Sequence, residues 1–79
     1  MAQTKPPRWP RPGFYNIWQG LEGARREELA MRLESSTAAV GHYAHGHRRM
    51  SPVRARDMVA ALREMGVSAT DHDMRPDLW

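Results

Sequence analysis

Two stretches of this chain repeat apolar residues at the spacing i, i+3, i+4, i+7, which places them along one face of an α-helix. They are Phe14, Ile17, Trp18 and Leu21 in the first stretch, and Ala55, Met58, Val59 and Leu62 in the second. Short helices of this kind cannot bury their apolar faces alone and must pack against other elements. The spacing therefore predicts a small all-α domain with one shared core.

Composition narrows the class of protein further. A chain of 79 residues is long enough for one small domain. The absence of cysteine excludes a disulfide framework, thiolate metal ligands and a thiolate nucleophile. No apolar run approaches the ~20 residues that span a bilayer, and the first residues lack the apolar stretch of a signal peptide. We therefore expect a cytoplasmic protein of a bacterium or phage, associated with the nucleoid and without a membrane partner.

A short turn near residues 34–36 separates two further predicted helices, which span about residues 25–33 and 37–45. This spacing is that of a helix-turn-helix. Glu34 stands where such a turn needs a left-handed backbone, which costs a non-glycine residue about 1 kcal/mol. The sequence therefore predicts a compact helix-turn-helix domain of four to five helices over residues 14–79, with a short C-terminal tail.

The helix predicted at residues 37–45 has an inward and an outward face. We expect Ala39, Val40 and Tyr43 to face inward. A recognition helix places its outward face in the major groove of DNA. The candidates for contacts to base edges are therefore Thr37, Ala38, Gly41, His42 and His45. Small residues on this face allow a close approach, and threonine and histidine can donate to or accept from a base.

Basic residues surround this predicted recognition helix. Residues 35–56 contain four arginines and three histidines and no acidic residue. A basic stretch without acids suits a polyanion such as double-stranded DNA, whose backbone carries one charge per phosphate. The candidates for contacts to phosphate are Arg26, Ser36, His47, Arg48 and Arg49. Because operators with two-fold symmetry favour dimers, we expect a homodimer, at least on DNA.

Residues 1–13 form a different kind of segment. Four prolines between residues 6 and 12 exclude a helix and favour an extended, basic arm. The arm carries Lys5, Arg8 and Arg11 without an opposing acid, so these residues are candidates for contacts in the minor groove. Two alternatives stay open for the arm. Either it orders only on DNA, or Trp9 folds back onto the core and holds it there.

The last part of the chain carries clear boundary signals. Ser51 is a candidate N-cap, and Pro52 follows at the first helical position, where its missing N–H costs nothing. Further on, Thr70 and Asp73 have the spacing of a capping box for one final helical turn. The apolar residues within 74–79 are expected to cover the core or to join a second subunit.

The second half of the chain also carries several motifs in a fixed order. They are Ser36-x-x-Ala39-Val40-x-x-Tyr43, then Gly46 with Arg48 and Arg49, then Pro52 with Arg54-Ala55, and finally His72-Asp73-Met74-Arg75-Pro76-Asp77-Leu78-Trp79. In this order they resemble the Cro-like, YdaS-type helix-turn-helix regulators of phages and prophages, over about residues 25–79. The resemblance implies a Cro/repressor-like fold and a sequence-specific transcriptional regulator that binds operator DNA. Glu34, Gly41 and His42 depart from the family pattern.

The sequence also bears on functions other than DNA binding. His42 and His45 are spaced i, i+3, but without cysteine or a paired-ligand pattern we expect no metal and no cofactor. Ser35 and Ser36 lie too close to His42 in sequence to form a convincing catalytic pair, so we expect no catalytic residue and no enzyme. The alternative function is an antitoxin-like or other protein-binding module that neutralises a partner protein, with the proline-rich arm as a docking segment.

Overall fold

The computed structural model describes residues 9–79, and this part of the chain is all-helical. It contains no strand and five helices: α1 (Phe14–Gly20), α2 (Gly23–Arg32), α3 (Thr37–His45), α4 (Pro52–Glu64) and α5 (Asp71–Met74). The predicted all-α class is confirmed, and the final helical turn expected from the capping box is α5. Within residues 9–79, no helix has the length and apolar character needed to cross a membrane.

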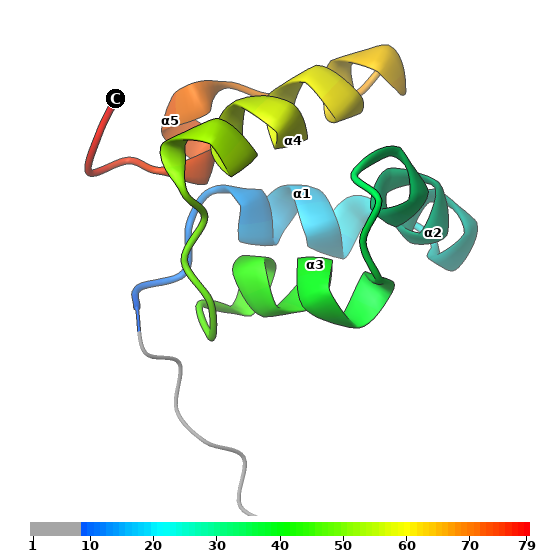
Figure 1. The fold of residues 1–79 in the computed structure, drawn as a ribbon, viewed down its shortest axis with the longest axis horizontal. Helices are drawn as coiled ribbons and strands as arrows, with labels where there is room; N and C mark the ends of the chain where they lie inside the picture. Colours follow the sequence, from blue (N-terminus) through cyan, green and yellow to red (C-terminus); the bar gives the residue numbers. More distant parts are fainter. Residues whose placement is uncertain (1–8) are drawn as a thin grey trace, which may run out of the picture.

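The buried apolar residues of the five helices form one core, and Figure 1 shows how the helices are arranged. Helix α1 packs against α3, α2 packs against both α3 and α4, and α5 packs against α4. In the view of Figure 1, α1 lies between α4 and α3, and α2 stands at one end of the molecule. The first described residues, the loop after α3 and the tail after α5 gather at the opposite end. Segments that are far apart in the sequence therefore meet there.

The core confirms both predicted apolar stripes. Its largest fully buried side chains are Phe14, Leu29, Val40, Met58 and Leu62. All residues of the two stripes are buried except Ile17, which is half-buried against the same cluster. Burial of such a side chain stabilises a fold by about 1.5–3 kcal/mol, so these stripes are a main source of the packing energy.

On α3 the inward face is rotated from the predicted one. Val40 is fully buried as expected, and Tyr43 packs half-buried against the core, but the second fully buried residue of the helix is Ala44, whereas Ala39 is only half-buried. Val40 and Ala44 stand at i, i+4 and so share one stripe of the helix. The sequence does not reveal this rotation, because an alanine gives almost no signal for burial. The consequence is that Gly41 faces α1.

The turn between α2 and α3 adopts the backbone expected for it. Glu34 has a φ of 52°, the only positive value at a non-glycine residue within residues 9–79. The N–H of Ser35 donates to the carbonyl oxygen of Ala30 at 2.8 Å. From α4, Nη1 of Arg54 donates to the carbonyl oxygen of Leu33 at 3.1 Å. These bonds tie the turn to α2, which precedes it, and to α4, which packs against α2.

The predicted helix starts are confirmed as well. The hydroxyl oxygens of Ser36 and Ser51 accept backbone N–H bonds at 3.1 Å, the first at α3 and the second at α4. Thr70 and Asp73 form the complete capping box of α5. Of the apolar residues of the tail, Met74 is buried in the core, as the first alternative expects, whereas Leu78 and Trp79 stay 47% and 38% exposed and do not cover it.

Replacing Glu34 by glycine is expected to raise the free energy of unfolding by about 1 kcal/mol, because glycine adopts the left-handed backbone without the steric cost of a Cβ. Urea and thermal unfolding of the two proteins measure the difference. Glu34→Ala is the matched control, since it removes the carboxylate but keeps the Cβ. Equal stabilisation by both variants would assign the effect to charge and contradict the backbone explanation.

Candidate functional site

Helix α3 presents a face of small and polar residues to the solvent. Thr37, Ala38 and His42 are exposed, and Gly41 and His45 are half-buried. The structure brings these five predicted base-edge residues together along one open groove. The other side of the groove comes from α1 and the start of α2, through Trp18, Gly23, Arg26 and Glu27.

Trp18 sets how closely α1 approaches this face. Its ring is 4% exposed, and a Cβ built on Gly41 would lie 3.6 Å from its Cζ2 atom. That distance is an ordinary van der Waals contact, so the ring lies directly beside Gly41 and an alanine side chain would still fit there. Gly41 thus both lines the groove and borders α1.

Three histidines lie close together at the C-terminal end of α3. The ring of His47 is 6.0 Å from that of His42 and 6.5 Å from that of His45. Tyr15 of α1 meets His45 edge-on at 5.4 Å, and the guanidinium carbon of Arg11 lies 4.4 Å from the centre of the Tyr15 ring. The fold thus adds Arg11 to a cluster that the sequence shows only as histidines. In the described part of the chain, no three potential ligands are arranged to hold a metal ion.

His45 has a perturbed acidity within this cluster. Burial lowers the pKa of His45 from its ordinary value of 6.5, and the positive charges of Arg11, His47, Arg26 and His42 lower it further. The neutral imidazole therefore predominates at pH 7. A negative charge brought to this surface would favour proton uptake, because it offsets the surrounding positive charges.

Two of the predicted phosphate contacts already have roles inside the domain. Arg26 donates from Nε and Nη2 to the carbonyl oxygen of Trp18 at 3.2 and 2.9 Å, and its guanidinium carbon lies 4.7 Å from the centre of the Trp18 ring. Because Arg26 is a cation at the C-terminal end of α1, it also interacts favourably with the negative end of the helix dipole. Ser36 caps α3 through the N–H of Ala39. Both residues help to position the groove.

The loop after α3 holds the other three predicted phosphate contacts, at residues 47–49, and all three are exposed. The guanidinium carbon of Arg48 lies 5.7 Å from the centre of the Tyr43 ring, and Arg48 takes part in none of the ion pairs found within residues 9–79. Arg49, in contrast, pairs with Asp77 of the tail at 2.5 Å. The two neighbouring arginines are equivalent in the sequence but not in the structure.

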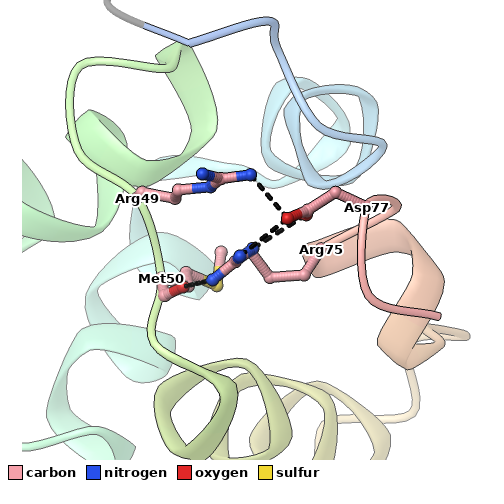
Figure 2. Close-up of polar contacts among 4 residues, drawn as sticks. All are labelled: Arg49, Met50, Arg75 and Asp77. Atoms are coloured by element: carbon pink, nitrogen blue, oxygen red, sulfur yellow. Dashed lines mark hydrogen bonds and ion pairs between the residues drawn. The ribbon is translucent and has the colours of Figure 1, made fainter.

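The carboxylate of Asp77 bridges two arginines (Figure 2). It accepts bonds from Nε and Nη2 of Arg75 at 2.9 and 2.7 Å and from Nη2 of Arg49. The remaining Nη1 of Arg75 donates to the carbonyl oxygen of Met50 at 2.7 Å. The tail is thereby fastened to the loop after α3. The hydrogen bonds from Arg75, with a smaller contribution from the charge of Arg49, lower the pKa of Asp77 to about 2.

Two acidic side chains thus belong to this surface although the sequence did not point to them. Glu27 lines the groove beside α3, and Asp77 lies against the loop. No local pattern could have identified Glu27, because its place depends on how α2 crosses α3. For Asp77 the Arg-Pro-Asp run of the tail was the available signal, since a bidentate arginine–carboxylate pair is a strong and geometrically specific contact.

The arm is described only from Trp9 onward, so Arg11 lies within the structure while Lys5 and Arg8 lie outside the described residues. The backbone N–H of Trp9 donates to the carbonyl oxygen of Gly46 at 3.1 Å, and the residue is half-buried. For residues 9–11 this contact favours the second alternative, in which Trp9 holds the arm against the domain.

Comparison with known proteins gives no further information about this surface. No model of a known family, no curated protein and no solved structure matches the chain. The chemistry of the surface itself therefore carries the functional conclusion.

Asp77 is expected to stay ionised down to about pH 2. Because its folded pKa is depressed, the network stabilises the fold above about pH 4, and this contribution is lost as the pH falls through the folded pKa. An NMR titration of the carboxyl carbon measures the value. Arg75→Gln is expected to raise the Asp77 pKa more than Arg49→Gln does, since the bonds from Arg75 are the main cause. A larger rise of the Asp77 pKa in Arg49→Gln than in Arg75→Gln would contradict this assignment.

Proposed function

We propose that the protein is a sequence-specific DNA-binding transcriptional regulator of the Cro/repressor-like helix-turn-helix class, with α3 as its recognition helix. The observation that carries the proposal is a basic surface around the C-terminal end of α3. His42, His45, His47, Arg11 and Arg48 gather there, and none of them takes part in the ion pairs found within residues 9–79. In this described part of the chain, Arg11 and Arg48 are cations without an acidic partner, and the three imidazoles can take up protons, so this surface suits a phosphate backbone.

The arrangement of α2 and α3 supports the same proposal. The two helices pack against each other and are joined by the tight turn at Glu34, as in a helix-turn-helix. In that class the second helix enters the major groove with its N-terminal residues nearest the bases. Thr37 and Ala38 stand at that end of α3, and His42 follows one turn later on the exposed face.

Different residues take different parts in the proposed complex. Thr37 and His42 read base edges, whereas Arg48 and His47 contact phosphates and set the register. Glu27, beside the groove, keeps a phosphate away from α2 and so helps to orient the duplex. We include a homodimer on DNA in the proposal, with the exposed Leu78 and Trp79 as apolar surface available to a second copy.

Selection of binding sites from a pool of randomised duplexes tests the proposal. A regulator is expected to enrich one sequence and to bind it roughly a thousandfold or more tighter than random DNA. Fluorescence anisotropy at several salt concentrations then gives the salt dependence, which phosphate contacts make steep. No enrichment together with a shallow salt dependence would overturn the proposal and favour the protein-binding alternative.

Arg48→Ala is expected to weaken binding to all DNA sequences alike and to reduce the salt slope by about 1. Arg49→Ala should cost less, because Asp77 already neutralises Arg49 in the free protein. His42→Ala should instead cost roughly 1–3 kcal/mol on the selected site and little on random DNA. Anisotropy titrations of the three variants against both duplexes separate these effects.

A fourth variant, Asp77→Asn, extends the same anisotropy titrations. Removing this carboxylate frees Arg49 and should strengthen DNA binding. Asp57→Asn is the matched control, since it makes the same charge change at an exposed position of α4. An equal gain in both variants would mean that only the net charge matters, which contradicts a specific role for Arg49.

DNA binding is expected to strengthen as the pH falls through the histidine range, about pH 7 to 5. Phosphates raise the depressed pKa of His45, so binding takes up a proton and gains up to about tenfold per pH unit for each proton. The groups around His45 that bear on this titration are Arg11, Tyr15, Arg26, His42 and His47.

Anisotropy titrations at several pH values measure this dependence. His45→Gln should flatten it, whereas His72→Gln on α5 should leave it unchanged, because the ring of His72 contacts the carbonyl oxygen of Trp79 in the tail. The same pH dependence in wild type and His45→Gln would rule out His45 as the group that takes up the proton.

A further inference from the structure

A small cavity lies at the end of the molecule where the arm, the loop after α3 and the tail meet. Its volume is about 130 Å³. Apolar and aromatic groups form most of its walls, namely Trp9, Pro12, Tyr43, Met50, Met74 and Pro76. Met50 and Met74 are otherwise buried, at 3% and 2% exposed, so the cavity reaches the edge of the core.

Four arginines also line this cavity, namely Arg11, Arg48, Arg49 and Arg75. Asp77 is the one carboxylate among the lining residues in the described chain, and it is held between Arg49 and Arg75. Arg11 and Arg48 face tyrosine rings and take part in none of the ion pairs within residues 9–79. The cavity therefore combines apolar walls with an excess of positive charge at its edge.

We propose that this cavity binds a small aromatic carboxylate, with its ring against Met50 and Met74 and its carboxylate at Arg48. The volume decides the size of the ring system, since an apolar cavity of roughly 150 Å³ holds one benzene molecule. The charge decides the head group, because a guanidinium binds a planar carboxylate through paired hydrogen bonds. A nucleotide or a peptide is too large for such a space.

Binding at this cavity would be coupled to DNA binding, and this coupling rests on the proposed function. The carboxylate of the ligand and a DNA phosphate would both use Arg48, so each would weaken the other by the same factor. The ligand site itself does not depend on DNA. It can therefore be tested on the free protein.

Titration of benzoate into the full chain, followed by NMR of methyl-labelled methionines, tests the site. The signals of Met50 and Met74 should shift and saturate. Met58, fully buried elsewhere in the core, and Met31, 77% exposed on α2, are internal controls whose signals should stay in place. Two control compounds should each bind at least about tenfold more weakly than benzoate. Benzyl alcohol lacks the charge that contacts Arg48, and acetate lacks the ring that contacts the methionines.

Two matched variants sharpen the experiment. Arg48→Gln should weaken benzoate binding at least about fivefold, by loss of a charge-assisted bond. Arg32→Gln, which removes the same charge at the surface pair with Glu28 and Glu64, should leave it unchanged. The proposal is overturned if Met50 and Met74 do not shift, if benzyl alcohol binds as well as benzoate, or if Arg48→Gln has no effect.

The alternative occupant of the cavity is a second copy of the chain, and a dilution series of the protein without benzoate tests for it. Concentration-dependent shifts of Met50 and Met74 would identify a second copy of the chain there and would also overturn the proposal. Because all these measurements omit DNA, their failure leaves the proposed regulator intact. Conversely, failure of the duplex selection would not contradict the proposed ligand site.

Discussion

Burial of the Trp18 ring between the first three helices determines where the outer face of α3 lies. The ring lies directly beside Gly41 of α3, and Arg26 of α2 both contacts the ring and binds the Trp18 carbonyl oxygen. One side chain of α1 thus sets the spacing to α3 and the attachment of α2. The groove along α3 exists because these three contacts are made at once, so its geometry depends on the core beneath it.

The charges of the molecule are arranged around that groove by the same packing. Basic side chains gather where the histidines at the end of α3 lie near Arg11, while Asp77 of the tail compensates the charge of Arg49. The result is a surface whose positive charge is concentrated on a few side chains. The net charge of +3 for the whole chain does not show where this positive charge lies. A charged side chain contributes fully to the potential of a surface only if no nearby partner neutralises it.

Much of the fold was accessible from the sequence because its signals are local. The apolar stripes of α1 and α4, the serine caps at Ser36 and Ser51, and the left-handed Glu34 each depend on residues within one or two helical turns. The rotation of α3 was not accessible in this way. Whether Tyr43 or Ala44 faces the core depends on the shape of the neighbouring helices, and alternatives one residue apart differ little in apolar pattern.

The helices, their ends and the distribution of basic residues along the chain could all be predicted from the sequence. These follow from backbone sterics, capping and hydrophobic periodicity, which act over a few residues. Three further features follow only from the packing of the helices: Arg11 lies near the histidines, Glu27 borders the groove, and Asp77 binds Arg49. Asp77 and Arg49 lie 28 residues apart in the chain. Such a contact depends on how the helices pack against one another, which no local pattern records.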